Sequence, residues 1–435
     1  MGEVRFKRLV EWVKSGLIVL LAACALLTGW QTGHFDDLVY SIPLFGSVAE
    51  FMKGGSETPD VKTGIIKEAA RPLVIVITNS SGERFGVKYD IAVRNEVYDR
   101  TSRIVGEALG SAAEAFQVTQ TQWREALSGE GLYYEYAVPV SLSILDGWLG
   151  TRLPELIADM QIKRIFVVFS GDRNRIYYED AESGIFYGAD TASTAGSVQE
   201  LEALSIGSEA VFAYQTGIAA SSLSPYMLLL PGNIHPVIAA SAGANAEEML
   251  LSVLAALGFD YGTETSTPYN IDGGIRVRVG TQFNIRADMQ GRILYRRTEG
   301  PYAIAGEEQD LTEGELVEMA RVIVSESMEP YIGSAEVFFE SVEMISPGVY
   351  CVNFSYYTAG GRVFLFDDSH AARITFVHGL VTEAEFIIRN YTFADESAAL
   401  YMERQAFAAA GGEFMLYYHD TGAELIQPAW VRVAT

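Results

Sequence analysis

Apolar residues are distributed along the chain in two ways: one uninterrupted run near the start, and many short segments of strand or helix length after it. The run is Gly16–Trp30, GLIVLLAACALLTGW, and it holds no charged residue. Basic residues precede it, at Arg5, Lys7, Arg8 and Lys14. Loops rich in Lys and Arg stay on the cytoplasmic side of a membrane. The pattern therefore predicts a cytoplasmic tail at 1–14, a transmembrane anchor at 15–31 and an exported remainder.

Large and small side chains divide the predicted anchor into two sets. The large apolar residues are expected to contact lipid: Leu17, Ile18, Val19, Leu20, Leu21, Leu26, Leu27 and Trp30. Ala25 and Gly29 are four residues apart, a spacing of small residues that lets a second helix approach closely inside a bilayer. With Ala22 on the same face, they are the predicted contact for a partner helix. A simple anchor rich in small residues is the alternative.

Two other fates of the run also export the rest of the chain. Leu21–Cys24 has the shape of a lipoprotein cleavage box, and a signal peptide could be cleaved after the run. However, the apolar sequence continues past Cys24 to Leu27, where lipoproteins turn polar, and the residues that follow form a poor cleavage site. The uncleaved anchor is therefore the favoured interpretation.

A juxtamembrane linker is expected at 32–70, and the first domain at 71–204. Leu73–Thr78 is short and β-branched, which predicts a buried strand. Asp90 precedes an amphipathic pattern that predicts a helix to about Phe116, and a second helix is expected near Trp123–Leu127. Strands around these helices predict an α+β domain.

A central α+β domain is expected at 205–306. Asn245 is a good N-cap, because its side-chain oxygen can accept from free backbone N–H groups, and the helix after it is closed by Gly258. Three short strand patterns then predict a small antiparallel meander at 275–279, 282–286 and 293–296.

A C-terminal domain is expected at 307–435. Thr312 and Glu315 form a T-x-x-E capping box at the start of an amphipathic helix. Strand patterns fill 336–390, a helix is expected at 397–409, and two short strands end the chain. The predicted fold class is α+β: a single N-terminal transmembrane helix and an exported multi-domain body of antiparallel sheets, each packed with one or two helices.

Charge and cysteine content narrow the function classes. The formal net charge is −25, which repels nucleic acid and anionic lipid headgroups, so no nucleic-acid partner is expected. The two cysteines, Cys24 and Cys351, are divided between the anchor and the body, which leaves no disulfide within the exported part. With 49% hydrophobic residues, the body can be stabilised by core burial instead.

Catalytic motifs are missing from the sequence, so no catalytic, cofactor-binding or metal-binding residue is assigned. There is no P-loop, G-x-S-x-G, H-E-x-x-H or dinucleotide fingerprint. The segment Asp367–His370 could hold a divalent cation, but an ordinary polar loop is favoured. His378, and Asp288 with Gly291, are likewise interpreted as turn residues and not as metal ligands. Ser221, Ser222 and Ser241 have no neighbouring base in a recognisable motif, so a serine hydrolase is not supported.

Aromatic residues at Tyr133, Tyr134 and Tyr136 could stack a sugar or a peptide. Alternating aromatics in a strand are more typical of core and cross-strand pairs, and that interpretation is favoured.

Four stretches together indicate a family. They are Trp123–Leu127 with Gly131–Tyr136, Leu257–Phe259 with Tyr269–Gly274, Asp288–Tyr295, and Arg373–Val381. In this order, and behind a basic N-terminus with one membrane helix, they resemble the YycH/YycI-type regulatory proteins. These proteins are associated with an essential cell-wall sensor histidine kinase in low-GC Gram-positive bacteria.

The resemblance implies regulation by contact and no enzymatic activity. The implied partners are a membrane sensor histidine kinase and a paralogous regulator, with the lipid bilayer contacted by the N-terminal helix. The implied location is the cell membrane, with the N-terminus cytoplasmic and the body outside. A cell-surface binding module for a peptide, wall polymer or metal ion is the alternative.

Overall fold

The computed structural model describes residues 68–151, 160–170, 173–193, 209–218, 225–243, 245–259, 266–271, 274–279, 283–298, 311–366, 369–410 and 413–433. The predicted tail at 1–14, the anchor at 15–31 with its partner contact, and nearly all of the linker lie outside these residues. So do Ser221, Ser222, Asp367 and Asp368. In the described part of the chain, no helix combines the length and the apolar composition that a membrane crossing requires.

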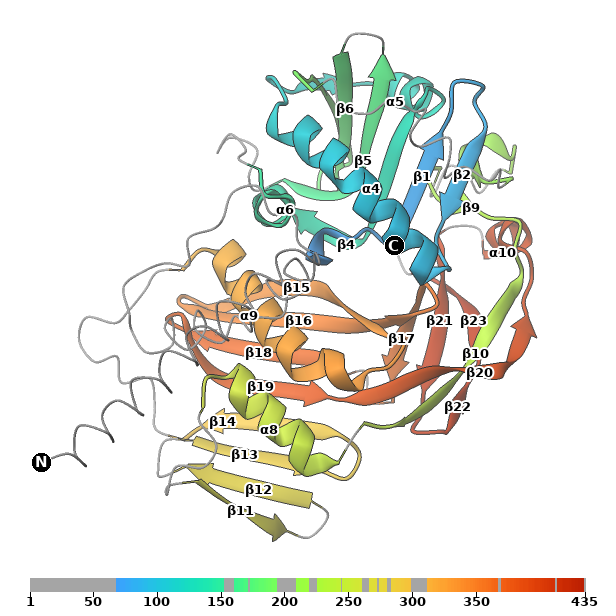
Figure 1. The fold of residues 1–435 in the computed structure, drawn as a ribbon. Helices are drawn as coiled ribbons and strands as arrows, with labels where there is room; N and C mark the ends of the chain where they lie inside the picture. The colour runs from blue at the N-terminus through green and yellow to red at the C-terminus, as the bar shows by residue number, and fades with distance from the viewer. Residues whose placement is uncertain are drawn as a thin grey trace, which may run out of the picture. The chain divides into compact units, whose positions relative to one another are not determined.

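The N-terminal domain is built on a seven-stranded antiparallel sheet in the order β2-β1-β4-β5-β6-β7-β3 (Figure 1). Its strands are β1 (Val74–Thr78), β2 (Arg84–Val87), β3 (Phe116–Val118), β4 (Gly131–Ser141), β5 (Gln161–Ser170), β6 (Arg173–Asp180) and β7 (Ile185–Asp190). Its helices are α4 (Ile91–Gly110), α5 (Gln120–Leu127) and α6 (Leu142–Leu149), with a 3₁₀ turn η1 (Glu68–Ala70) before the first strand.

Both faces of this sheet are covered, which explains why β1 is buried at all five positions. On one face, Tyr134 of β4, which pairs with Ile75, shares a 2.5 Å hydrogen bond between hydroxyl groups with Thr101 of α4. On the other face Trp123 of α5 lies fully buried in a cluster with Val76 and other apolar side chains. A strand buried on both sides must be apolar throughout, as its sequence is.

The second sheet has eleven strands and extends across the predicted boundary between the central and C-terminal domains. Its order is β11-β12-β13-β14-β19-β18-β16-β17-β21-β23, with β15 paired to β16. The strands are β11 (Ser266–Ile271), β12 (Gly274–Val279), β13 (Phe283–Asp288), β14 (Arg292–Arg297), β15 (Glu336–Ser346), β16 (Val349–Thr358), β17 (Gly361–Leu365), β18 (Ala372–Val377), β19 (Leu380–Ile387), β21 (Phe414–Asp420) and β23 (Pro428–Arg432). Since β14 pairs with β19, the predicted meander is continuous with the C-terminal sheet.

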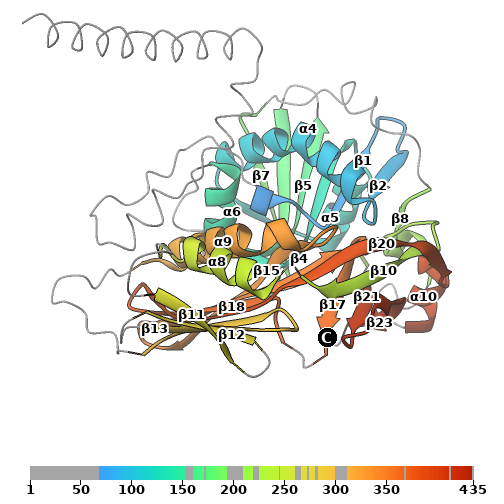
Figure 2. The ribbon, with the colours of Figure 1, turned by 60° about the horizontal axis from the view of Figure 1, so that its bottom comes forward.

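Two helices cover one face of the eleven-stranded sheet (Figures 1 and 2). They are α8 (Ala246–Ala256), which packs on β12 and β13, and α9 (Glu313–Met328), which packs on β15, β16 and β18. Both begin as the sequence predicts. Asn245 accepts from the N–H of Glu247, and Thr312 and Glu315 form the reciprocal capping box.

Two small sheets complete the described chain. One has the order β20-β10-β22 and consists of β20 (Arg389–Ala399), β10 (Ile234–Ala242) and β22 (Leu425–Ile426). The other pairs β8 (Val211–Phe212) with β9 (Leu228–Leu229). Helix α10 (Glu403–Ala410) packs beside this pair in a shared cluster of buried apolar side chains. The remaining short turns are η3 (Ala213–Gln215) and η5 (Glu329–Tyr331).

The helix predicted at 397–409 was placed too early. Strand β20 continues to Ala399 because it pairs with β10 up to Ile234, and the helix begins only at Glu403. The fold as a whole is α+β with mostly antiparallel sheets and few helices; among the named strand pairs that are described, only β17 with β21 is parallel.

Candidate functional site at the junction of two sheets

Buried charges join the N-terminal sheet to the C-terminal part of the chain. Lys88, directly after β2, places its ammonium 3.1 Å from the carboxylate of Glu403, the first residue of α10. Glu403 is fully buried, and it also accepts from the hydroxyl of Tyr89 and, at 2.6 Å, from the backbone N–H of Leu230. A carboxylate without water is stable only when donors surround it, as here.

Two further pairs have the same polarity. Arg94 of α4, fully buried, donates to Glu336 of β15 at 2.6 Å, and Lys163 of β5 donates to Glu413 at 2.9 Å. In every case the cation comes from the N-terminal domain and the carboxylate from the C-terminal part. We call these two pairs, together with Lys88–Glu403, the seam.

A second layer of carboxylates surrounds Arg164, next to the seam. Arg164 donates to Glu135 at 3.1 Å and to Glu179 at 3.0 Å. Burial opposes its charged form, but the surrounding carboxylates outweigh burial and raise the pKa of Arg164 above its ordinary value. Burial, with the negative charge of Glu135, also raises the pKa of Tyr133 well above its ordinary value. Arg164 therefore stays charged and Tyr133 stays neutral at neutral pH.

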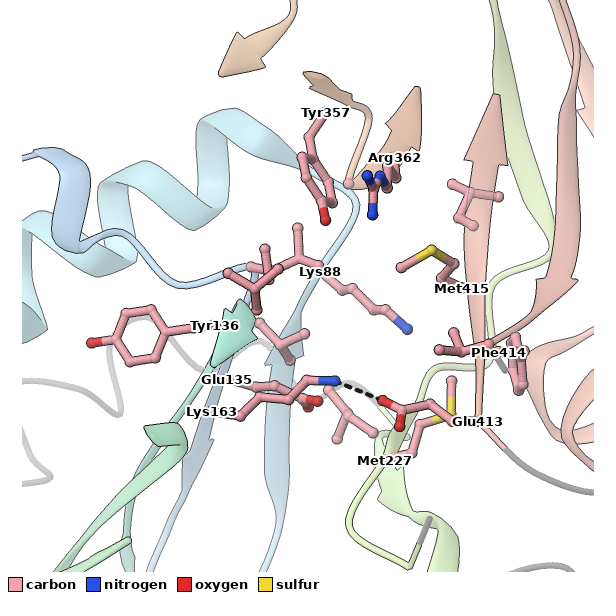
Figure 3. A pocket seen from close by; sticks show the side chains of 18 of the residues that line it. Lys88, Glu135, Tyr136, Lys163, Met227, Tyr357, Arg362, Glu413, Phe414 and Met415 are labelled. Carbon is pink, nitrogen blue, oxygen red and sulfur yellow. Dashed lines mark hydrogen bonds and ion pairs between the residues drawn. The ribbon is translucent and has the colours of Figure 1, made fainter. Parts of the chain in front are cut away.

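A pocket of about 210 Å³ lies at the seam, between the end of the N-terminal sheet and strands β16, β17 and β21. In Figure 3 the side chains of Lys88, Lys163 and Arg362 point toward the same space from different elements. Most of the other lining is apolar, including Leu73, Val74, Met227, Leu228, Phe414 and Leu416. A small ligand there would meet apolar walls and a few charged groups of both signs, since Glu135 and Glu413 also line the pocket.

The described lining carries three cations, and each of them is already ion-paired. It includes no Ser, Cys or His, and Lys88, Lys163 and Arg362 each have a carboxylate partner. Within the described residues there is also no cluster of three or more His, Cys, Asp or Glu side chains that could hold a metal ion.

Arg362 connects the pocket to a second polar cluster, around Glu340 of β15. The carboxylate of Glu340 accepts from Arg362 and Ser355, and it lies 2.8 Å from Nδ1 of His370. Burial alone would raise the pKa of Glu340, but the hydrogen bonds from His370 and Ser355 and the charge of Arg362 lower it to about 2. His370, considered as a metal ligand from the sequence, is thus a partner of Glu340.

The other residues singled out in the sequence lie in turns and cores. Tyr133, Tyr134 and Tyr136 are buried at 1%, 0% and 3% exposure, as core residues are. The carboxylate of Asp288 accepts from the N–H groups of its own turn, at 290 and 292, and His378 has a turn conformation with φ of 50°. Ser241 lies in strand β10, on which it is exposed. None of these residues lines the pocket except Tyr136.

The seam could not be found from the sequence. Lys88 and Glu403 are 315 positions apart, and each stands in an unremarkable polar context. The only local signal is the position of Lys88 directly after a strand pattern. If other elements bury that end of the strand, the lysine needs a carboxylate partner.

Comparison with known proteins shows what fold this arrangement has. No family model matches the sequence, and no curated protein matches it significantly. The dehydratase domain of MlnD from Bacillus amyloliquefaciens has a TM-score of only 0.11, at 8% identity over 73% of this chain and 88% of that one. The dehydratase domain from the CurF module of curacin polyketide synthase has a TM-score of only 0.13, at 10% identity over 67% of this chain and 100% of that one. Neither similarity is strong enough to indicate a shared fold. The structure of YycH from Bacillus subtilis superposes with a TM-score of 0.55, at 8% identity, over 85% of this chain and 95% of that one. The chain therefore has the YycH-type fold that its sequence pattern indicates.

Proposed function

We propose that this chain is a non-enzymatic regulator, anchored in the cell membrane by residues 15–31, with its body outside the cell. It modulates a two-component sensor histidine kinase through contacts of its transmembrane helix and its extracytoplasmic domains, and a paralogous regulator is a further partner. The observation that carries the proposal is the YycH-type fold, which extends over 95% of the YycH chain. The paired charges of the pocket agree with a role in binding rather than catalysis.

The physical requirement for such regulation is a difference in contact energy. A kinase changes its activity only if the regulator binds one of its conformations more tightly than another. Small residues at Ala25 and Gly29 provide one such contact, because they allow two helices to pack backbone to backbone. The folded body provides the other.

The membrane contact is tested by substituting both small residues with Ile. The full-length A25I/G29I variant is expected to lose co-purification with the sensor kinase from membranes and to change signalling. The matched control is L20I/L27I, which alters anchor positions on the opposite side of the predicted helix and is expected to keep both. If the small-residue variant associates and signals as the unchanged protein does, the membrane contact is excluded.

The pocket favours a second candidate function, a cell-surface binding module. Its volume of about 210 Å³ would take one small acidic group of a peptide or wall fragment, beside the ion-paired cations Lys163 and Arg362. Soluble muropeptides would then raise the Tm of the protein. A V433W variant, which fills the pocket, would abolish that rise. A rise that persists in V433W places the ligand elsewhere.

A further inference from the structure

Arginine residues gather in the β12–β14 meander although the chain is strongly acidic. Between residues 274 and 298 there are six arginines and one carboxylate, Asp288, whereas the whole chain has a formal net charge of −25. Asp288 is engaged with the backbone of its own turn. The meander is therefore a local region of positive charge.

Strand register places most of these arginines on one face. Val277, Ile285 and Tyr295 are directly opposite one another on β12, β13 and β14 and are buried on the side of the sheet where α8 packs. Successive residues of a strand point to opposite faces, so the positions between them face away from α8. Those positions include Arg276, Arg286, Arg292 and Arg296, of which the last three are exposed. We call this surface the arginine face.

The sheet itself neutralises only the inner part of the arginine face. Arg292 donates to Glu385 at 2.6 Å and Arg296 to Glu383 at 2.6 Å, and both carboxylates belong to the neighbouring strand β19. Farther out, Arg276 and Arg286 are directly opposite each other on adjacent strands, with no carboxylate in ion-pair contact among the described residues. Like charges at opposed positions destabilise a sheet. The Nε–H of Arg276 is in addition buried without a hydrogen-bond acceptor in the described structure.

We propose that Arg276 and Arg286 bind carboxylates of an acidic segment from a partner protein. The geometry for this contact is already present one strand away, where Glu383 and Glu385 satisfy the same kind of arginine. The planar guanidinium can bind a carboxylate through two parallel hydrogen bonds, which suits a row of arginines on a flat sheet.

Charge on the rest of the molecule decides between an acidic segment and an anionic membrane. A large anionic surface would be repelled by a body of net charge −25, whereas a short segment interacts only with charges within the ~10 Å screening length. The inference deepens the proposed function, since it locates one contact of the regulator's body; it rests on that function only for the identity of the partner.

The test uses the full-length chain and a fluorescent peptide with glutamate at alternate positions, followed by fluorescence anisotropy. The R276Q/R286Q variant is expected to bind the peptide about tenfold more weakly than the unchanged chain. The matched control is R100Q/R103Q, which removes the same charge from exposed arginines of α4 and is expected to bind normally. Binding should weaken as salt is raised to about 0.15 M.

Three results would overturn the inference. They are an unchanged chain that does not bind the peptide, an equal loss in the R100Q/R103Q control, and phosphatidylglycerol vesicles that bind the unchanged chain but not R276Q/R286Q. The last would assign the face to an anionic membrane. Co-purification of the kinase separates this inference from the proposed function: if the unchanged chain does not bind the peptide but co-purifies with the kinase, the inference is wrong and the proposed function is retained.

Discussion

Lys88 and Glu403 form an ion pair of 3.1 Å in which the side chains are only 9% and 0% exposed. Lys88 directly follows strand β2 of the N-terminal sheet, and Glu403 is the first residue of α10. A charge removed from water is costly unless its partner and further donors are fixed around it. The pair therefore stabilises one particular arrangement of these elements, and with it the walls of the adjacent pocket.

Removing one member of this pair should destabilise the protein strongly. Both E403Q and K88M leave the other charge buried and unpaired, and we expect each to lower the free energy of unfolding by about 3 kcal/mol or more. Urea denaturation of the full chain measures the loss.

The double variant K88M/E403Q should lose less than the sum of the single variants, because no unpaired charge remains. The control is E96Q, which breaks an exposed pair on α4 and should cost below about 1 kcal/mol. Strictly additive losses in the double variant would show that the two residues do not interact.

Gly360, in the turn between β16 and β17, is a second point of contact at the seam. Its φ is +69°, and a Cβ atom there would lie 2.2 Å from the carbonyl oxygen of Lys88. G360A must therefore both strain the turn and push the two backbones apart. Gly82, at φ +82° with open space around it, is the matched control for the strain alone. We expect G82A to cost about 1 kcal/mol and G360A at least 2 kcal/mol more, as measured by urea denaturation. Equal costs would mean that the contact with Lys88 relaxes freely.

Helix starts and turns that are stabilised by contacts between nearby residues could be predicted from the sequence. Asp90 accepts from Val93, and Thr312 and Glu315 form their capping box, because these contacts lie within one turn of a helix. The meander was predicted for the same reason, since its turns at Asp288 and Gly291 depend on nearby residues.

Contacts between distant segments could not be predicted in this way. Nothing in the sequence of β14 specifies β19 as its neighbour. Both strands alternate apolar and polar residues, as many other strands do, so the pattern does not identify the partner. The end of strand β20 was predicted to be helical, but residues 397–399 pair with 234–236 of β10, more than 160 positions earlier, and this pairing overrides a helix-compatible composition. The pocket is lined by segments that lie between Leu73 and Val433 in the sequence, so it too could not be predicted from local patterns.

Acid should weaken the cluster around Glu340. The pKa of its carboxyl is lowered from 4.5 to about 2, so the contribution to stability is complete above pH 4.5 and is lost as the pH falls toward 2. Because the side chain is partly exposed to solvent, we expect a contribution of about 2 kcal/mol. Urea midpoints between pH 6 and pH 2 should fall less steeply in E340Q than in the unchanged chain, whereas E107Q, on the surface of α4, should keep the original slope. A parallel slope in E340Q would contradict the assignment.

His235 should give the protein a second pH dependence, at higher pH. The ring is 2% exposed, lies edge-on to Tyr89 and Trp430, and its Nε2 has no hydrogen-bond partner in the described structure. Burial lowers the pKa of His235 below its ordinary value of 6.5, with smaller and opposed effects from Glu403 and Lys88. The unfolded chain therefore binds a proton that the folded chain does not, and stability falls as the pH drops through about 6.5.

An H235F variant keeps the aromatic contacts and removes the titrating group. Its free energy of unfolding should therefore change less between pH 7.5 and pH 5.5 than that of the unchanged chain. The control is H419Q, at an exposed position of β21, which should leave the pH dependence intact. Urea denaturation at each pH provides the comparison. If H235F retains the full pH dependence, another group is responsible, and His235 is protonated as readily in the folded chain as in the unfolded one.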